Sequence, residues 1–251
     1  MKISSRVEYK YPCDLDKSQK VKSILSQSPL WKYDSFCPGG NSYWVSSLYW
    51  DTREMFSYHD SISGEYTKAK LRLRAYSSQS HQAFSTLKAE VKSRVDKICD
   101  KAVASVESKH IDLTSFETCF PEDLFGFYRR RCKSYKMQPL MPVAVVLYER
   151  LGFVHLNQKS RITIDQNIIA LPPHLFFQSF QFIQSNQNFE SVVELKDCNQ
   201  NAAEIQNITR YLSVPRQKFS KYCQAVDSLE ASKIWKKKQM VAGTVTRPSL
   251  V

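Results

Sequence analysis

The chain has 251 residues, enough for one large domain or two small ones with a buried core. A hydrophobic fraction of 42% and an aromatic fraction of 12% indicate a globular protein and exclude an intrinsically disordered one. The formal charge of +12 favours acidic partners such as nucleic acid, anionic lipid or phosphorylated small molecules.

Targeting signals and metal motifs are absent from the sequence pattern. No apolar run reaches the ~18–20 residues that a membrane-spanning helix needs, and the N-terminus lacks the apolar core of a signal peptide. The seven cysteines are odd in number, and no pair shows Cys-x-x-Cys spacing. We therefore expect reduced thiols in a cytoplasmic protein, without a transmembrane segment or a zinc site.

Several segments alternate polar and apolar residues, which is typical of strands with one buried face. The stretch KAKLRLR at 68–74 places four cations on one side and Ala or Leu on the other. In chain order, we expect strands at 4–10, 43–50, 68–76, 86–94, 99–106, 143–154, 159–165 and 191–196.

Helices are predicted between and after these strands, from capping residues and helical spacing. They are a helix capped by Asp14 that runs to about residue 27, a helix over 53–61 capped by Asp51 or Thr52, a helix from Pro121 to Tyr135, and helices over 200–212 and 216–238. Loops are expected at Gly39-Gly40 and 77–83, and the tail 241–251 is expected to be mobile. The order of elements is not a regular βαβ alternation, so it predicts a mostly antiparallel α+β fold, with 1–240 as a single domain.

The charge on the predicted strands is the most informative feature. At least five strands carry a polar face dominated by Lys and Arg, with single carboxylates between them. Like charges opposite each other across a sheet repel, by roughly 3 kcal/mol at ~5 Å and an effective dielectric of ~20. A single such strand is explained by a solvated face. The recurrence of one sign over many strands favours a closed sheet with a cationic interior that holds anions.

An ordered set of short motifs resembles the VTC domain, the polyphosphate polymerase domain of the vacuolar transporter chaperone family. This family belongs to the triphosphate tunnel metalloenzymes, relatives of the CYTH proteins. The resemblance extends from about residue 5 to 230. It rests on RVEYK (6–10), SLYWDT (47–52), KLRLR (70–74), EVK (90–92), YER (148–150) with Phe153, RITID (161–165), VELK (193–196) and FSKY (219–222).

The resemblance implies a closed eight-stranded antiparallel β tunnel with flanking helices, whose basic lining holds a triphosphate or polyphosphate. The implied phosphate-binding and catalytic residues are Lys10, Arg72, Arg74, Lys92, Arg150, Arg161, Lys218 and Lys221. Further ligand contacts are expected from Lys70, Tyr148, Lys196 and Ser220. Glu194 matches the glutamate that binds Mn²⁺ or Mg²⁺, and Glu8 and Glu90 either join it or balance charge. Arginine and lysine side chains suit phosphate oxygens, and a hard cation needs only one or two protein carboxylates beside them.

Two departures from the family pattern affect these expectations. CYTH relatives open with Glu-x-Glu-x-Lys, whereas Arg6 stands at the first position here, which removes one metal carboxylate and favours the polymerase-like branch. Trp50 replaces the usual Phe or Tyr, and we expect only packing to change. Some residues keep a purely structural alternative: Glu194 as an ion-pair partner, Tyr148 as a core tyrosine, and Asp165 as the holder of a tunnel arginine.

The leading functional hypothesis is a metal-dependent polyphosphate polymerase that transfers the γ-phosphate of ATP to pyrophosphate or polyphosphate. A tripolyphosphatase of the same fold and a polyphosphate-binding module without turnover are the alternatives. Nucleic-acid binding fits the charge but lacks exposed stacking motifs or a recognition-helix pattern. The oligomeric state is not encoded in these patterns.

Overall fold

The computed structural model describes residues 1–77, 86–96, 98–108, 111–113, 115–132, 138–182, 191–199 and 202–230. Within these ranges the chain forms a nine-stranded antiparallel sheet. Eight strands close into a ring because β7 pairs with both β3 and β8, and the short β2 extends the β3 side of β7. The strands are β1 (Lys2–Cys13), β2 (Trp31–Tyr33), β3 (Tyr43–Thr52), β4 (Thr67–Ser77), β5 (Thr86–Val95), β6 (Ile98–Glu107), β7 (Leu140–His155), β8 (Arg161–Leu171) and β9 (Ser191–Lys196).

The ring confirms the closed eight-stranded antiparallel fold that the sequence predicts. Its strand order is β7, β3, β4, β5, β6, β1, β9 and β8, after which β8 returns to β7. β1 shares its length between two neighbours, since its first half pairs with β6 and its second half with β9. Closure leaves these eight strands without a long free edge.

The strict alternation of each strand separates a charged lumen from an apolar exterior. In β4, Leu71 and Leu73 are fully buried in a hydrophobic cluster outside the ring, whereas Arg72 and Arg74 contact carboxylates inside it. Leu87, Ala89 and Val91 of β5 join the same outer cluster. The apolar faces therefore pack outward against helices, as the sequence indicates, and the cations line the interior.

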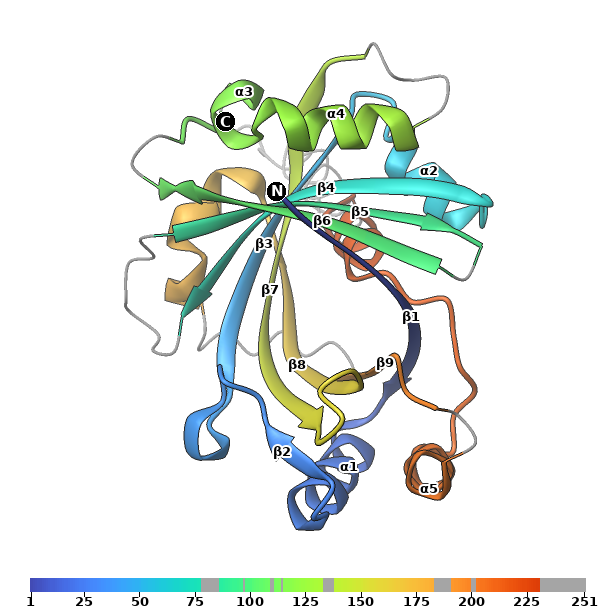
Figure 1. The fold of residues 1–251 in the computed structure, drawn as a ribbon. Helices are drawn as coiled ribbons and strands as arrows, with labels where there is room; N and C mark the ends of the chain where they lie inside the picture. Colours follow the sequence, from blue (N-terminus) through green and yellow to red (C-terminus); the bar gives the residue numbers. More distant parts are fainter. Residues whose placement is uncertain are drawn as a thin grey trace, which may run out of the picture.

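Helices cover two regions of the barrel surface (Figure 1). One group lies across β4, β5 and β6, and the other packs beside β2, β8 and β9. The first group is α3 (Phe116–Cys119) and α4 (Glu122–Arg131); the second is α1 (Leu15–Gln27) and α5 (Ala203–Leu212); α2 (Phe56–Ile62) packs on β3 and β4. Residues 221–230 form a further helix. Short 3₁₀ segments occur at η1 (Pro38–Gly40) and η3 (Pro173–Phe182).

Three helix boundaries differ from the sequence-based expectation. The helix expected from residue 53 begins at Phe56, because Met55 adopts a left-handed conformation with φ of 59°. The helix expected to reach Tyr135 ends at Arg131, where Cys132 is extended. The helix expected from 216 begins at 221, because the preceding segment is held in a non-helical path by a hydrogen bond from Gln217 N–H to the Lys10 carbonyl.

Other elements were missed or fall outside the described ranges. The pattern gave no sign of β2, α3 or the 3₁₀ segments, all of which are short or lack a clear period. The loop expected at 77–83 and the tail 241–251 lie almost wholly outside the described residues. All seven cysteines are buried, and the described residues show no disulfide among them.

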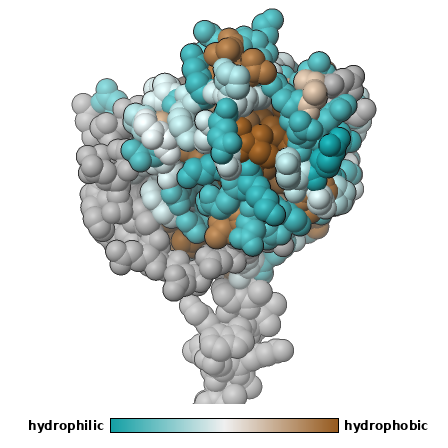
Figure 2. Space-filling view, turned by 90° about the horizontal axis from the view of Figure 1, so that it is seen from below, coloured by the Kyte–Doolittle hydropathy of each residue, from teal (hydrophilic) through white to brown (hydrophobic). Residues whose placement is uncertain are grey.

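The described surface is largely polar. Seen from below, hydrophilic residues dominate, and apolar side chains gather in a smaller group near the middle of the face (Figure 2). None of the described helices has the length and apolar character needed to span a membrane.

Candidate functional site

A cavity of about 460 Å³ runs inside the barrel. Its walls come from β1, β3, β4, β5, β6, β7 and β9, together with α2 and the segment that leads into the helix 221–230. Thirteen of its lining side chains are Lys or Arg and three are Asp or Glu. The lining cations are Arg6, Lys10, Lys68, Lys70, Arg72, Arg74, Lys92, Arg94, Arg150, Lys196, Arg216, Lys218 and Lys221.

A row of lysines crosses three adjacent strands of the cavity wall. Lys70 of β4 lies directly opposite Lys92 of β5, and Lys92 lies directly opposite Lys101 of β6. Like charges in this arrangement repel. Lys92 pairs with Glu8 and Lys101 with Glu90, but the Lys70 Nζ donates at 2.8 Å to the Ser220 hydroxyl and not to a carboxylate. The row therefore retains uncompensated positive charge at Lys70.

Glu90 is a fully buried counterion for the arginines of β4. Its Oε2 lies 2.7 Å from Arg72 Nη2 and 3.6 Å from Arg74 Nη1, and its Oε1 lies 2.6 Å from Lys101 Nζ. Burial by itself would raise the pKa of this carboxyl, but the three cations outweigh it and hold the pKa well below its ordinary value. Glu90 is ionised and fixes the two arginine forks beside the cavity.

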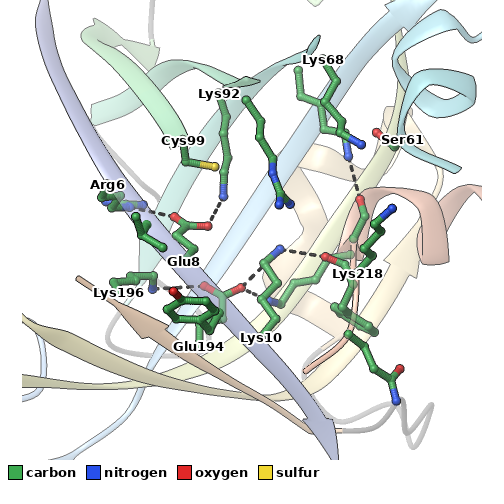
Figure 3. A pocket seen from close by; sticks show the side chains of 18 of the residues that line it. Arg6, Glu8, Lys10, Ser61, Lys68, Lys92, Cys99, Glu194, Lys196 and Lys218 are labelled. Carbon is green, nitrogen blue, oxygen red and sulfur yellow. Dashed lines mark hydrogen bonds and ion pairs between the residues drawn. The ribbon is translucent and has the colours of Figure 1, made fainter. Parts of the chain in front are cut away.

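Glu194 of β9 projects into the cavity among four cations (Figure 3). Its Oε1 lies 3.0 Å from Lys221 Nζ and 3.9 Å from Lys10 Nζ, and its Oε2 lies 3.1 Å from Lys196 Nζ and 3.8 Å from Arg150 Nη2. Burial opposes ionisation, yet these neighbours hold its pKa well below the ordinary value. Glu194 is thus an anion surrounded by positive charge.

Glu8 of β1 occupies a similar but smaller cluster nearby. Arg6 Nε donates to Glu8 Oε1 at 2.7 Å, and the Lys92 ammonium donates to Oε2 (Figure 3). Burial raises the pKa of Glu8, but the charge of Lys92 reverses this, and the net shift is well below the ordinary value. The negative charge of Glu194 acts on Glu8 in the opposite direction, so the two carboxylates sense each other.

Arg150 of β7 is held by the fully buried Asp165 of β8. Its Nε and Nη2 donate to the two carboxylate oxygens at 2.6 and 2.7 Å, and Lys221 Nζ lies 2.6 Å from Asp165 Oδ2. Such a bidentate pair fixes the guanidinium plane. Asp165 therefore holds a lining arginine, which is the structural role that the sequence favours for it.

The C-terminal segment is fixed against the barrel by the aspartate of the SLYWDT motif. Asp51 accepts hydrogen bonds from Ser57 N–H and Tyr58 N–H at the start of α2, and from the Tyr222 hydroxyl at 2.5 Å. Tyr222 also stacks on Tyr49, with ring centroids 5.0 Å apart. This contact fixes the first turn of the helix 221–230 and so directs Lys221 into the cavity. Trp50 faces away from the lumen and packs edge-to-face on Phe116 and Phe120.

Two cavity groups titrate near neutrality. Burial lowers the pKa of Lys70 to about 8. For Tyr49, burial raises the pKa, but the adjacent Arg72 and Arg74 outweigh it and lower the pKa to about 8. The Tyr49 hydroxyl accepts from Arg72 Nη1 at 3.0 Å. Both groups become less favourable to an anion as the pH rises through 8.

The carboxylates suit a divalent cation only in the presence of phosphate. Within the described ranges, no group of three or more His, Cys, Asp or Glu side chains is placed to hold a metal ion. Glu194 is the one carboxylate with both oxygens inside a ring of ammonium and guanidinium groups. Mg²⁺ and Mn²⁺ take one or two carboxylates together with phosphate oxygens and water. The donor set therefore fits such an ion if a phosphate chain first attracts the surrounding cations.

Most residues implied by the family resemblance meet in this cavity. Lys10, Arg72, Arg74, Lys92, Arg150, Lys218 and Lys221 line it, as do Lys70, Tyr148, Lys196, Ser220, Glu194 and Glu8. Glu90 lies behind the lining arginines. Arg161 is apart from the cavity lining: its Nη2 lies 2.6 Å from Asp34 Oδ2, and 43% of its side chain is exposed.

The structure also adds residues that the sequence did not single out. Lys68 and Arg94 lie opposite each other on β4 and β5, and Arg6, Arg216 and Cys99 complete the lining. The alternation of KAKLRLR pointed to Lys68 on the same face as Lys70. No periodic signal exists for Arg216, because it lies in an irregular segment.

The family comparison covers most of the chain. A family model described as the VTC domain matches residues 5–230. None of the curated proteins compared with the chain matches it significantly.

Solved structures share the fold at low sequence identity. A Bacillus halodurans protein described as a candidate adenylate cyclase has a TM-score of 0.57 and 12% identity, covering 88% of this chain and 96% of its own. The PH1012 protein of Pyrococcus horikoshii has a TM-score of 0.41 and 10% identity, covering 86% and 96%. The Pct1 RNA triphosphatase of Schizosaccharomyces pombe has a TM-score of 0.32 and 12% identity, covering 82% and 75%.

Proposed function

The chain belongs to the VTC domain family, and from this premise we propose that it is a metal-dependent polyphosphate polymerase. It transfers the γ-phosphoryl group of ATP to the end of a phosphate chain held in the barrel cavity. The observation that carries this proposal is the closed cavity in which thirteen cations face three carboxylates. An anion with many closely spaced charges is the ligand that best compensates such a lining.

The reaction needs alignment and charge neutralisation more than covalent help from the protein. A terminal phosphate oxygen of the acceptor attacks Pγ, the bond between Pγ and the β,γ-bridging oxygen breaks, and ADP leaves with that oxygen. No proton has to move if the acceptor oxygen is already ionised. The groups of this chain that serve the step are the arginine forks and the lysine ammonium groups of the lining.

The arginines are placed to hold the phosphates between which the bond changes. Arg72 and Arg74 are oriented by Glu90, and Arg150 is oriented by Asp165. Because these forks are fixed before the ligand binds, little of their conformational entropy is lost on binding. Lys10 and Lys221 converge on the same region through their contacts with Glu194.

Glu194 is the residue that would hold Mn²⁺ or Mg²⁺, together with phosphate oxygens. When bound, such an ion supplies Lewis-acid neutralisation of charge on the reacting phosphates. In its absence Glu194 balances Lys10, Lys196 and Lys221. Glu8 and Glu90 are each engaged by cations of their own and serve as counterions.

The direct test is to incubate the purified protein with ATP and Mn²⁺ and to resolve the products on a gel. ADP release with the appearance of phosphate polymers supports the proposal, and Arg72→Ala should abolish both. The matched control is Arg161→Ala, which removes a guanidinium that lies outside the cavity lining. ATP hydrolysis without any polymer would reject polymerisation.

Tripolyphosphatase activity is the second candidate. It is favoured by the restricted volume of the cavity, about 460 Å³, which suits a short chain. Release of orthophosphate from tripolyphosphate, with no transfer from ATP, would select it. Binding of tripolyphosphate without turnover of either substrate would instead identify a binding module.

A further inference from the structure

The loop between β2 and β3 crosses one end of the barrel and is anchored on its wall. Asp34 N–H donates to the Gly152 carbonyl at 2.9 Å, and Gly152 N–H donates to the Cys37 sulfur at 3.2 Å. A Cβ atom added at Gly152 would lie 2.1 Å from Asp34 Oδ2. Arg161 holds the same carboxylate from β8 at 2.6 Å. The absence of a side chain at Gly152 thus lets the loop pack directly on β7.

Three aromatic rings lie together where this loop crosses. Phe36 contacts Tyr43 and Tyr76, with ring centroids 5.6 and 5.8 Å apart, and the two tyrosines lie 6.1 Å apart. By strand alternation Tyr43 shares the inward face of β3 with Ser47 and Tyr49, which both contact arginines of the lumen. We call Phe36, Tyr43 and Tyr76 the aromatic plug.

The aromatic plug lies beyond the last residues that line the cavity. Arg74 is a lining residue and its guanidinium sits 6.0 Å from the Tyr76 ring, but none of the plug residues lines the cavity. The pKa of Tyr43 is raised, first by burial and with a contribution from Asp34, in keeping with its position under the loop. Lys88 covers the plug, with its Nζ 5.6 Å from the Phe36 ring and 5.2 Å from the Tyr76 ring.

Positive charge gathers at the opposite end of the cavity. Lys68 and Arg94 face each other there across β4 and β5, and Lys218 joins them from the C-terminal segment (Figure 3 shows Lys68 and Lys218 on the same side). Burial and the charges of Arg94 and Lys218 lower the pKa of Lys68. We call Lys68, Arg94 and Lys218 the cationic mouth.

We propose that the cavity is blind: a phosphate chain enters end-first through the cationic mouth and stops at the aromatic plug. The site then takes the terminus of a chain and not its interior. This inference rests on the proposed function in one respect, that the ligand is a linear polyphosphate. If ATP adds phosphate to a chain in this cavity, the product leaves by the mouth through which it entered and stays short.

The first experiment measures binding and does not need turnover. Inorganic polyphosphates of three defined lengths are saturated with the protein at physiological salt, and the number of protein molecules per chain is determined by sedimentation. A blind cavity predicts one protein at each chain end, whatever the length. A number that rises in proportion to chain length would overturn the inference, because it requires threading or surface binding.

The second experiment opens the plug. In the double variant Phe36→Ala, Tyr76→Ala we expect the number bound per chain to rise with chain length and, with ATP and Mn²⁺, longer products than the wild type makes. Phe177→Ala is the matched control, since Phe177 is as exposed as Phe36 (45% against 47%) but lies in η3. Should the double variant not fold, Gly152→Ala displaces Asp34 by its extra methyl group and tests the same prediction.

The outcomes separate the two proposals. Long products from the wild type, equal to those of the plug variant, would overturn the blind cavity but leave polymerisation intact. Failure of the wild type to make any polymer would reject the polymerase, while the binding numbers would still decide whether the cavity is blind.

Discussion

Arg150 donates two hydrogen bonds to Asp165 across neighbouring strands of the barrel, at 2.6 and 2.7 Å. The arginine lines the cavity, and the aspartate is fully buried behind it. A buried carboxylate thus positions a guanidinium for an external anion and also lowers the cost of keeping that guanidinium in the cavity when no ligand is bound. The same division recurs where Glu90 supports Arg72 and Arg74.

This relationship predicts opposite effects of Asp165→Asn on stability and on binding. Loss of one partner leaves Arg150 and Lys221 without their counterion, which lowers the free energy of unfolding by about 3–5 kcal/mol. The uncompensated cations then gain more from a bound anion, so tripolyphosphate should raise the melting temperature of the variant more than that of the wild type.

The matched control for this prediction is Asp34→Asn. It also removes a buried carboxylate paired with an arginine, but Arg161 is not a lining residue. Asp34→Asn should lower stability without a larger response to tripolyphosphate. An equal response of both variants would show that Asp165 does not govern the charge of the cavity.

The second prediction concerns two arginines that the family motifs treat alike. Arg72 lines the cavity, and its guanidinium is fixed by Glu90 and Tyr49; Arg161 pairs with Asp34 outside the lining. Removal of a charge-assisted phosphate contact costs roughly 1.5–3 kcal/mol, about tenfold or more in affinity. By calorimetry we expect Arg72→Ala to lose at least tenfold in tripolyphosphate affinity and Arg161→Ala to change less than twofold. A comparable loss in both variants would place Arg161 in the binding site.

Sequence alternation accounts for much of this site because a strand in a closed sheet has only two faces. In KAKLRLR the leucines enter the outer cluster, and the arginines enter the lumen. The closure itself followed from the repeated sign of the charge, and the ring of eight strands confirms it. The family motifs named most of the lining residues before any geometry was known.

What alternation does not give is the pairing of charges and the path of irregular segments. The distance from Glu194 to Lys221 depends on how the segment before residue 221 crosses the barrel, and a hydrogen bond from Gln217 to Lys10 fixes that path. The position of Phe36 depends on a loop with no period and on a glycine 116 residues away in the chain. Only tertiary contact identifies such relationships.

The third prediction separates the two roles of the lumen glutamates. Glu194→Gln should remove the stimulation of tripolyphosphate binding by Mn²⁺, while binding without metal becomes tighter, because Lys10, Lys196 and Lys221 lose a competing anion. Calorimetric titration with and without Mn²⁺ measures both effects. Glu90→Gln is the control: it removes a carboxylate that three cations engage behind the lining, so stimulation by Mn²⁺ should persist. Unchanged Mn²⁺ stimulation in Glu194→Gln would exclude Glu194 as a ligand.

The fourth prediction is a loss of phosphate affinity as the pH rises from about 7 to 9. Burial lowers the pKa of Lys70 to about 8, so in the free protein its ammonium is largely charged below this pH and largely neutral above it. A bound phosphate favours the charged form, and binding above pH 8 must therefore take up a proton, which weakens it as the pH rises. Ionisation of Tyr49, whose pKa also lies at about 8, adds negative charge beside Arg72 and acts with the same sign.

Affinities measured for matched variants separate these contributions from the titration of the ligand itself. Tyr49→Phe removes the phenol in every protein compared. In that background Lys70→Met should bind tripolyphosphate more weakly at pH 7 but nearly as well at pH 9, where the native lysine is neutral. A shift of one pKa unit corresponds to about 1.4 kcal/mol, so we expect the ratio of affinities to fall roughly tenfold between these pH values. A ratio that does not change with pH would mean that Lys70 stays charged throughout, and that burial does not shift its titration into this range.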